Sequence, residues 1–524
     1  MKKAKKRATA FHGKNHSSRN IDVAKGPPDD FVREMVGLFN AGNLNLFAQK
    51  ANTAIKRWPD HPIGWKALGN LLLMQGKRQD ALEPLSKCVQ LAPEDAQAYN
   101  NLGSALLELD RFAEAEINFR KALKLHPDYA PAHANLGTVL QELDRLDEAV
   151  ESYQKALVLN PDYALAHNNL GNVFRTKGDF ARAKECYLRA VALNPNLPET
   201  NLNLGLILEK QPGEKANAMK YYHKALTLDP GLAEAHQHYG NILALNGKIE
   251  GLEHLEKANQ LKPDLEFLQQ QLGASYLQFG RKDEATMWLE IALQQNPDDV
   301  DAQYYLSLAE GRLPASETRT KYVKNLFDNY SSNFENHLVE KLEYRVPQRA
   351  REMIEEIYGK NIRFQNMADL GCGTGLSGIA FRDCTEHIVG IDLSQKMLDI
   401  ATEKGVYDML LQGEITQILD ELDQEFDFFL ATEVTIYLQK LDSLFASIRK
   451  SGASGALFVF STERFDGDGF AVNEQSGRTA HSAEYIHALA EKFNFQIIKD
   501  TRIPLRKDKE SWAEGELYIL ECSK

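Results

Sequence analysis

One short stretch of the chain combines glycines and a carboxylate at a spacing that suits a ligand site. It reads D-L-G-C-G-T-G at residues 369–375, and an apolar segment, residues 362–370, leads into it. The apolar segment predicts a buried strand. The glycines predict a turn that presents backbone N–H groups to a ligand at the start of a helix, which continues to about Asp383. Glycine suits such a turn because a Cβ would hold the ligand away from the backbone.

A second carboxylate follows at the end of the next apolar segment, residues 387–391. Asp392 lies twenty-one residues after Gly371. An acid at the tip of the neighbouring strand is placed to accept hydrogen bonds from a ribose diol. A dinucleotide fingerprint, G-x-G-x-x-G, would need glycine at position 376, where the chain has Leu376. An NAD(P) dinucleotide is therefore a distant alternative.

The pattern D-x-G-x-G-x-G resembles motif I of the class I S-adenosylmethionine (SAM) methyltransferases. The resemblance implies that the glycine turn passes under the amino-acid moiety of SAM, that Asp392 holds the ribose, and that Glu414 lies near the adenine. A glutamate in a loop with no role is an equally good interpretation of Glu414. The full set of cofactor contacts implied in this way is Asp369, Gly371, Cys372, Gly373, Gly375, Asp392, Leu393, Met397, Glu414 and Tyr330.

Candidates for acid–base chemistry on a methyl acceptor are fewer. Glu433 and Tyr437 follow the predicted fourth strand, where an open α/β sheet forms its ligand crevice. His481 lies in a polar loop, G-R-T-A-H-S, that opens a late helix; it is a candidate acid, base or substrate ligand, or only a helix cap. Cofactor binding is the alternative role for Glu433. Arg478 in the same loop could pair with an acidic group of a substrate. The absence of an N/D-P-P-Y/F motif after the fourth strand disfavours methylation of an exocyclic base amine.

The elements that must position these residues alternate between strand and helix, as a parallel α/β sheet demands. Strands are expected at residues 362–370, 387–391, 408–412, 426–433, 455–461, 495–501 and 517–521, and helices at 394–404, 441–450 and 481–493. Seven strands at this spacing predict a Rossmann-like methyltransferase fold. Before the first strand, a segment F-D-N-Y at residues 327–330 resembles the part of many SAM methyltransferases that covers the cofactor; an ordinary amphipathic helix is the alternative.

The chain repeats itself from about residue 31 to residue 313. Prolines recur with a period of 34, varied once to 35 and once to 33, at Pro59, Pro93, Pro127, Pro161, Pro195, Pro230, Pro263 and Pro297. Glycines and small residues keep the same period. This is the tetratricopeptide (TPR) signature, one helix–turn–helix per repeat, and single repeats must stack to bury their apolar faces. It predicts an α-solenoid of seven full repeats, with a partial repeat before them and a capping helix, residues 300–313, after them.

The domains expected are therefore a disordered basic tail over residues 1–28, a TPR superhelix over 29–313 and a methyltransferase domain over 314–524. The tail is rich in lysine and arginine and poor in apolar side chains, so it cannot offset its ordering entropy. A solvated tail is the simpler interpretation, and a tether to nucleic acid or membrane is the alternative.

Four asparagines occupy the same place in successive repeats, two residues before the repeat glycine. They are Asn101, Asn135, Asn169 and Asn203. An amide both donates and accepts hydrogen bonds, so a ladder of amides suits an extended polypeptide. The arrangement is similar to the asparagine ladder in the TPR arm of O-GlcNAc transferases. Asparagine is also common at this place in TPR sequences, so the ladder has a second interpretation as ordinary repeat sequence.

The composition and charge of the chain argue against several classes of protein and of binding site. A net charge of −13 argues against a protein that binds nucleic acid by general electrostatics. The five cysteines have no C-x-x-C spacing, which is typical of a reducing compartment without a disulfide framework or a zinc site. No apolar run approaches the length of a membrane span, and no secretory signal is recognisable. A cytoplasmic, soluble protein without a metal is expected, and its oligomeric state is open.

Several motifs together resemble a bacterial family of TPR-containing class I methyltransferases over nearly the whole chain: D-L-G-C-G-T-G-L-S-G, G-I-D-L-S-x-x-M-L, A-T-E-V-x-I-Y-L and S-G-R-x-A-H-S. The resemblance implies a SAM-dependent methyltransferase whose TPR arm recruits a protein, either as the substrate or as the carrier of one. The alternatives are a small-molecule O- or N-methyltransferase whose arm serves only assembly, and a scaffold with a degenerate methyltransferase fold.

Overall fold

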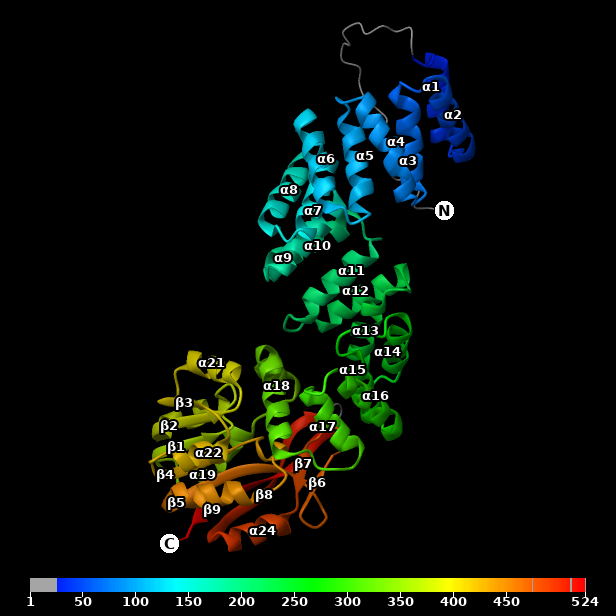
Figure 1. The fold of residues 1–524 in the computed structure, drawn as a ribbon. Helices are drawn as coiled ribbons and strands as arrows, with labels where there is room; N and C mark the ends of the chain where they lie inside the picture. Colours follow the sequence, from blue (N-terminus) through cyan, green and yellow to red (C-terminus); the bar gives the residue numbers. More distant parts are fainter. Residues whose placement is uncertain (1–25, 474, 509–510, 524) are drawn as a thin grey trace. The chain divides into compact units, whose positions relative to one another are not determined.

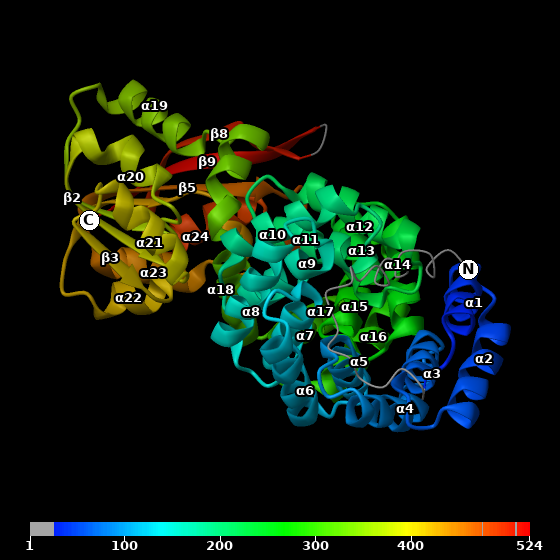
Figure 2. The same ribbon diagram turned by 90° about the horizontal axis from the view of Figure 1, so that it is seen from above.

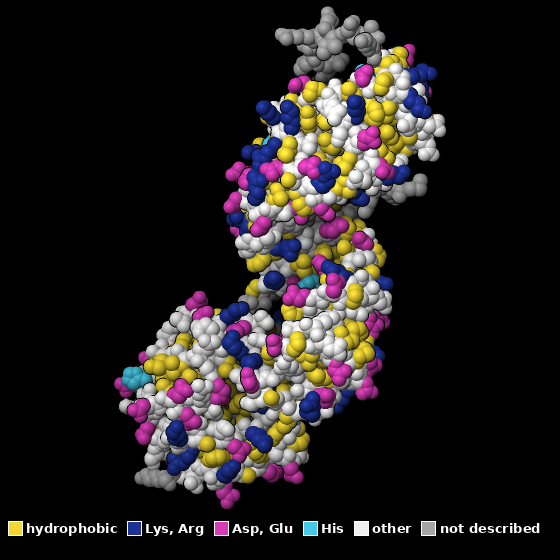
Figure 3. Space-filling view, in the orientation of Figure 1, with side chains coloured by type: hydrophobic (Ala, Val, Ile, Leu, Met, Phe, Trp, Pro, Cys, Tyr) yellow, Lys and Arg dark blue, Asp and Glu magenta, His cyan; other side chains and the backbone are white. Residues whose placement is uncertain are grey.

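A computed structural model describes residues 26–473, 475–508 and 511–523 of the chain. It divides into two compact units, Met1–Leu208 and Glu209–Lys524, and each is described by itself. The expected basic tail lies almost entirely outside the described residues. Acidic and basic side chains are interspersed on the face shown in Figure 3. Among the described helices, none has the length and apolar character needed to cross a membrane.

The repeat region consists of short antiparallel helices that follow one another in pairs (Figure 1). Their bounds are α1 Asp29–Asn40, α2 Leu44–Arg57, α3 Pro62–Met74, α4 Arg78–Leu91, α5 Ala96–Leu107, α6 Phe112–Leu125, α7 Ala130–Glu142, α8 Leu146–Leu159, α9 Ala164–Thr176, α10 Phe180–Leu193, α11 Pro198–Glu209, α12 Lys215–Leu228, α13 Ala233–Leu245, α14 Glu250–Leu261, α15 Leu268–Gln278, α16 Lys282–Gln295 and α17 Val300–Ala309. The TPR solenoid expected from the sequence is confirmed.

The repeat glycines allow the two helices of a pair to approach closely. A Cβ on Gly137 would lie 2.9 Å from the ring of Tyr153, and one on Gly171 would lie 2.7 Å from the ring of Tyr187. Both tyrosines are completely buried. Since protein interiors are close-packed, a side chain larger than hydrogen at these positions would displace the aromatic ring that fills the seam.

The segment expected as a partial repeat is a helical pair in its own right, α1 and α2. Its core is made by Met35, Phe47, Ala51 and Ala54. The sequence pattern understated it because the pair lacks the periodic glycine that marks the later repeats.

A sheet with helices on both faces follows the repeats. Its elements are α18 Ser316–Glu335, a π-helix Asn336–Lys341, α19 Val346–Tyr358, β1 Phe364–Leu370, α20 Leu376–Phe381, β2 Thr385–Asp392, α21 Gln395–Lys404, β3 Met409–Gln412, α22 Ile415–Glu421, β4 Phe426–Ala431, α23 Asp442–Ser451, β5 Gly452–Arg464, β6 Phe470–Val472, β7 Thr479–His481, α24 Ala483–Lys492, β8 Phe495–Asp508 and β9 Ser511–Cys522. Short 3-10 turns follow α20 and β4, at Arg382–Cys384 and Thr435–Tyr437.

The described strands form one sheet of nine, not seven. Its order is β3-β2-β1-β4-β5-β7-β6, and β9 pairs antiparallel with β5 and β8. All pairs from β3 through β5 are parallel. The two strands missed by the sequence analysis, β6 and β7, form a hairpin of three-residue strands. Such short strands leave no detectable alternation in a sequence.

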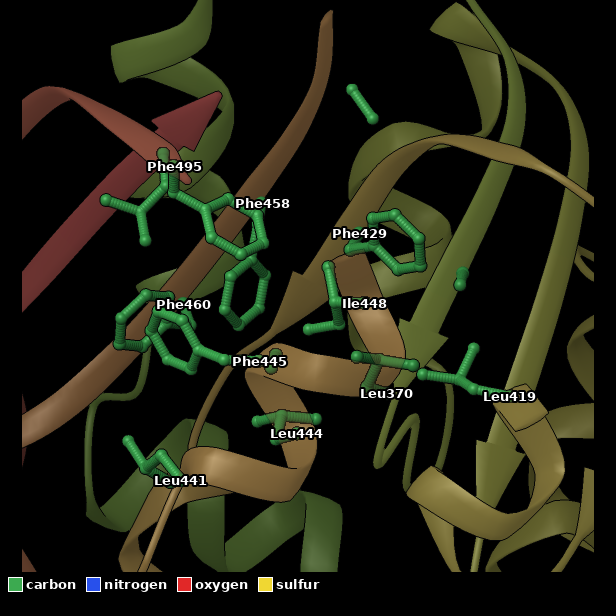
Figure 4. Packing of buried hydrophobic residues seen from close by; sticks show 14 of the residues in the cluster. Leu370, Leu419, Phe429, Leu441, Leu444, Phe445, Ile448, Phe458, Phe460 and Phe495 are labelled. Carbon is green, nitrogen blue, oxygen red and sulfur yellow. The ribbon is translucent and has the colours of Figure 1, made fainter. Parts of the chain in front are cut away.

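Alternate residues of each strand enter two separate cores, one on each face of the sheet. Helices α19 and α20 cover one face, and α22, α23 and α24 cover the other (Figure 2). In the second core, Leu444, Phe445 and Ile448 of α23 point toward the strands, and Phe445 meets Phe458 edge to face at 5.5 Å (Figure 4). The sheet is therefore buried on both sides, and its open positions lie at the strand ends.

The expected helix 481–493 begins later than the sequence indicates. His481 is the last residue of β7, and α24 starts at Ala483 with Ser482 as its N-cap, whose hydroxyl accepts a hydrogen bond from the Tyr485 N–H. The interpretation of His481 as a residue of the helix or its cap is wrong, because the chain pairs with β5 and β6 up to that point.

Candidate ligand site at the carboxyl ends of the strands

A cavity lies at the carboxyl ends of β1, β2 and β4. Residues from the glycine turn, from the end of β2 and from the segment after β4 line one side of it, and α18 lines the other. Lining residues that the sequence analysis named are Gly371, Cys372, Gly373, Asp392, Leu393, Met397, Glu414, Glu433 and Tyr437. The sheet thus brings nine of the thirteen candidates for cofactor binding and catalysis to one cavity.

The glycine turn adopts a conformation that glycine alone accepts easily. Gly371, Gly373 and Gly375 have φ values of 69°, 52° and 92°, which lie in the left-handed region. A Cβ on Gly371 would lie 2.5 Å from Val434, whereas a Cβ on Gly373 would have only the ring of Phe334 nearby, at 3.8 Å. The turn is packed from behind at Gly371 and open to the cavity at Gly373.

Most N–H groups of the turn already have partners within the protein. Gly371 and Cys372 donate to the Ile391 carbonyl at 2.8 and 3.0 Å, and Gly373 donates to the Asp392 carboxylate at 2.9 Å. In the structure these three groups donate within the protein, so the turn offers a ligand close approach to its backbone; donation from the turn to a ligand stays a prediction. Thr374, which the sequence analysis missed, lines the cavity with a buried hydroxyl that has no hydrogen-bond partner in the described part of the chain.

Asp392 is oriented by two backbone N–H groups. Its Oδ2 accepts from Gly373 and its Oδ1 accepts from Ser394 at 2.9 Å. Burial raises the pKa of this carboxyl, while the backbone hydrogen bonds oppose the rise. Each carboxylate oxygen can accept more than one hydrogen bond. The group is thus held in one orientation and keeps acceptor capacity toward the cavity.

Asp369 lies behind the turn and does not line the cavity. It is 1% exposed, and its Oδ2 accepts a 2.7 Å hydrogen bond from the Tyr407 hydroxyl. Tyr407 also accepts from the Gly378 N–H at 3.1 Å. A Cβ on Gly378 or Gly390 would lie within 3.0 Å of this ring. Asp369 therefore supports the turn through Tyr407, and the geometry favours a structural role over contact with a ligand.

The stability of the ligand-free protein should depend on Asp369 as pH changes. Burial raises its pKa to about 7, and the nearby Asp392 adds to the rise. Because the folded-state pKa exceeds the ordinary value near 4, the contribution of this group to stability is present in full below about pH 4. It is lost as pH rises toward 7. The difference in unfolding free energy between Asp369→Asn and wild type should therefore shift in favour of the variant from pH 5 to pH 8, by roughly 2–3 kcal/mol.

Thermal unfolding of Asp369→Asn and wild type at the two pH values measures this change. Exposed Asp399 on α21 provides a control, since Asp399→Asn should shift the melting temperature equally at both. A difference between Asp369→Asn and wild type that does not vary with pH would show that the carboxyl does not titrate in this range.

Glu433, the second residue after β4, lines the cavity and has an unusual backbone conformation. Its φ of 59° is left-handed although it is not glycine. Its Oε2 accepts from Arg506 Nη1 at 2.5 Å, and the other side of the guanidinium donates to Glu463. Arg506 is 3% exposed. Burial raises the pKa of Glu433, and Arg506 and then Arg478 oppose the rise.

The remaining predicted residues differ in their relation to the cavity. Tyr437 lines it beside Glu433, and burial raises its pKa. Tyr330 does not line it, although its α18 neighbours Phe327 and Phe334 do. His481 is 1% exposed and lies outside the lining; its Nδ1 is 3.0 Å from the Thr462 hydroxyl and its Nε2 is 3.2 Å from the Gln439 carbonyl. Burial lowers the pKa of His481 to about 4, so it is neutral at pH 7.

Helix α18 connects the cavity to the last repeats. Val323 and Phe327 line the cavity and belong to the apolar cluster of α14 to α17. On the same helix, the ring of Tyr322 stacks on that of Tyr304 in α17, with centroids 3.8 Å apart. The Tyr304 hydroxyl in turn donates to the Gly477 carbonyl in the β6–β7 hairpin at 3.1 Å. One wall of the cavity is therefore packed against the repeats.

Three residues important to the site escaped the sequence analysis: Thr374, Tyr407 and Arg506. Thr374 lies inside the recognised glycine pattern and could have been found by asking which side chain faces the ligand. Tyr407 and Arg506 are 38 and 73 residues from the carboxylates they contact. No local pattern marks such distant pairs.

In the described part of the chain, no group of three or more His, Cys, Asp or Glu side chains is arranged to hold a metal ion.

Family models match both regions of the chain. Models of the tetratricopeptide repeat match residues 41–96, 94–157 and 199–305, and a TPR repeat model matches 142–176 and 171–211. A model of the methyltransferase domain matches residues 368–460. That range begins in β1 and ends in β5, so it includes the glycine turn, Asp392 and Glu433.

Curated relatives match parts of the chain. An uncharacterized protein of Methanocaldococcus jannaschii is 22% identical over 221 residues, which are 38% of this chain and 99% of its own length. The 18S rRNA (guanine-N(7))-methyltransferase RID2 of Arabidopsis thaliana is 41% identical over 51 residues, 10% of this chain and 18% of its own. The malonyl-[acyl-carrier protein] O-methyltransferase of Serratia marcescens is 26% identical over 98 residues, 19% of this chain and 38% of its own. The chain thus spans less than half of either named methyltransferase.

Proposed function

The chain has the domain composition of a TPR-containing class I methyltransferase, and from this premise we propose that it transfers a methyl group from SAM to an acceptor recruited by its TPR array. We also propose the domain limits 29–313 for the array and 314–524 for the methyltransferase domain. The observation that carries the proposal is the cavity itself, in which an open glycine turn and an oriented carboxylate face each other.

The residues present fit SAM. The position of Gly373 is open where a Cβ would fill the space, so the amino-acid moiety can approach the backbone, and the orphaned Thr374 hydroxyl can donate to it. Asp392 keeps acceptor capacity for the ribose diol. Leu393 and Met397 follow Asp392 along the wall and offer apolar contact to the adenine, with Glu414 at its rim. SAM supplies a methyl group activated by the sulfonium, so the protein has to align it and exclude water.

The acceptor end of the cavity lies next to Glu433 and Tyr437. We propose these two as the residues that contact the acceptor. For His481, burial outside the cavity and two hydrogen bonds favour a role in holding the loop after β4 through Gln439 over a role as acid or base. Phe327 and Phe334 of α18 close the opposite wall, which excludes water from the reacting groups.

We propose that the asparagine ladder contacts a polypeptide partner. In the structure, ladder amides also connect neighbouring repeats: Asn101 donates to Asn70 at 2.7 Å, Asn135 to Asn100 at 3.0 Å, and Asn203 to Asn172 at 3.0 Å. Asn169 accepts from Asn168 at 3.1 Å. An amide has two donor hydrogens and two acceptor lone pairs. The bonds named use only part of this capacity, and all four side chains are half-buried.

The acceptor belongs to one of two classes in this proposal. It is a side chain of the recruited protein, or it is a small group delivered on a carrier protein. The second class is favoured by the Serratia relative, whose name gives malonyl-[acyl-carrier protein] as its substrate. A small-molecule enzyme with an assembly-only arm is the remaining alternative.

Incubation of a lysate with methyl-labelled SAM and the full-length chain tests the proposal. Label in a protein band supports a protein acceptor or carrier, and label confined to small molecules supports the assembly-only alternative. No label above a reaction without enzyme, together with no binding of SAM in calorimetry, would contradict methyl transfer.

Replacing Asn101, Asn135, Asn169 and Asn203 together by alanine should lower protein labelling at least about tenfold, because each lost amide removes a hydrogen bond of about 0.5–1.5 kcal/mol. SAM affinity should be unchanged. A circular dichroism melt shows whether the array still folds. If the quadruple variant folds and labels protein at the wild-type rate, the ladder serves only to connect the repeats.

A further inference from the structure

Resting on the proposed methyl transfer, the geometry points to an amine as the acceptor: we propose that Glu433 Oε1 accepts a hydrogen bond from the N–H of an amine bound between Glu433 and the aromatic wall of the cavity. Neither the family models nor the relatives assign an acceptor group to this chain.

Hydrogen bonds of the segment after β4 fix the position of Glu433. Its N–H donates to the Ser461 hydroxyl at 3.0 Å, and two residues later the Thr435 hydroxyl donates to the Ser461 carbonyl at 2.7 Å. These bonds hold the segment after β4 against the end of β5. A non-glycine residue in the left-handed region costs about 1–3 kcal/mol and persists where its surroundings impose it. The side chain is thus directed by the fold and not by its own preference.

The two carboxylate oxygens of Glu433 have unequal surroundings. Oε2 is bound by Arg506, whereas Oε1 is buried and has no hydrogen-bond partner among the residues that the structure describes. The side chain is 15% exposed, and the residue lines the cavity. A buried acceptor without a partner is unfavourable, so a donor that reaches Oε1 is bound with a gain. An N–H or O–H of a ligand is such a donor, and the oxygen of a carboxylate ligand is not.

The positive and negative side chains near Glu433 balance one another. Glu433, Glu463 and Arg506 form a connected group with two carboxylates and one guanidinium. Arg478 acts on Glu433 electrostatically from the β6–β7 hairpin. Arg319 on α18 also lines the cavity, where it interacts electrostatically with Tyr304 and then with Glu414. The end near Glu433 therefore does not carry an excess of positive charge that would attract an anionic acceptor.

Four aromatic side chains line the cavity and form what we call its aromatic wall: Phe327, Phe334, Tyr344 and Tyr437. Phe327 meets Tyr437 edge to face at 5.3 Å and Phe334 at 5.8 Å. Aromatic rings stabilise ammonium groups, above all methylated ones, through cation–π attraction. A carboxylate and aromatic rings that line the same cavity suit the methylated ammonium that the step forms.

The chemistry of the step also favours an amine over an aliphatic hydroxyl. The amine lone pair forms the new N–C bond while the C–S bond breaks, its electron pair stays on sulfur, and the N–H proton passes to Glu433 Oε1. The amine attacks in its neutral form, and the proton leaves the methylated ammonium, whose pKa is near 10, so the attack does not depend on a strong base. An aliphatic hydroxyl is a much weaker nucleophile in its neutral form, and a carboxylate is too weak a base to deprotonate it before the attack.

Sinefungin is the probe for this inference, since it carries a primary amine where SAM carries the transferable methyl group. Calorimetry with the full-length chain compares it with S-adenosylhomocysteine, which lacks any group there. We expect sinefungin to bind wild type roughly tenfold more tightly, and Glu433→Gln to weaken sinefungin roughly tenfold or more, as for a charge-assisted hydrogen bond. Affinity for S-adenosylhomocysteine should stay within about twofold, which also shows that the variant is folded.

The control is Glu421→Gln on the exposed end of α22, which should leave both affinities unchanged. Equal affinities of Glu433→Gln and wild type for sinefungin would overturn the inference. Release of methyl label from the modified acceptor as volatile methanol in base would also overturn it, because esters are cleaved in this way and methylamines are not. Failure of both ligands to bind wild type would instead refute the proposed function itself.

Discussion

Asp392→Ala is expected to lower the affinity of the chain for SAM about 100-fold or more. In the proposed site this carboxylate accepts two hydrogen bonds from the ribose, and bonds to a charged acceptor contribute about 1.5–3 kcal/mol each. The substitution also leaves the N–H groups of Gly373 and Ser394 without the acceptor that they now share. The glycine turn then loses one of the bonds that hold it in its left-handed conformation.

Calorimetry of SAM and S-adenosylhomocysteine binding measures this effect. Asp399→Ala on α21 is the matched control, since that carboxylate is exposed and its hydrogen bond is to Gln395 on the same helix. We expect the control to bind both ligands as wild type does. Wild-type affinity in Asp392→Ala would mean that another group contacts the ribose, and the role proposed for the end of β2 would have to be given up.

Arg506→Ala is expected to destabilise the protein by about 3–5 kcal/mol, the usual cost of removing one partner from a buried ion pair. The guanidinium is 3% exposed and lies between Glu433 and Glu463. Without it, two carboxylates remain in a buried position with no positive charge hydrogen-bonded to them. Their mutual repulsion and lost solvation oppose folding, so the loss should be larger at pH 8 than at pH 5, where protonation relieves part of it.

Denaturant unfolding monitored in the methyltransferase domain tests this expectation. Arg502→Ala on the same strand is the matched control, because Arg502 is 67% exposed and 3.7 Å from Glu516; it should cost less than about 1 kcal/mol. The triple variant Arg506→Met, Glu433→Gln, Glu463→Gln should recover most of the stability. If Arg506→Ala were as stable as the Arg502 control, the buried charge cluster would not exist as described.

The architecture of the chain could be predicted almost completely from its sequence. Prolines at a period of 34 and buried aromatics such as Tyr153 and Tyr187 specify paired helices whatever the distant parts of the chain do, because each repeat contacts its neighbours. The order of strands and helices after residue 360 was likewise predicted, except for α22 and the β6–β7 hairpin. Its three-residue strands are too short for a pattern.

Most residues proposed for cofactor binding could also be predicted, since they lie at the ends of predicted strands. Gly373, Asp392, Leu393 and Glu414 all line the cavity. Asp369 shows the limit of this reasoning. A conspicuous carboxylate at a strand end was assigned to a ligand, and the fold uses it to hold Tyr407 instead.

The sequence by itself determined the two regions of this protein, the order of most of their elements and the strand ends at which the cavity lies, because local periodicity and the ends of parallel strands carry that information. Only the tertiary structure decided which polar groups are satisfied. Whether Asp369 faces Tyr407, whether Arg506 neutralises one oxygen of Glu433 and leaves the other without a partner, and whether His481 is withdrawn from the cavity all depend on residues far apart in the chain. Side-chain hydrogen bonds act over about 3 Å, so they are set only when the sheet and α18 bring such residues together.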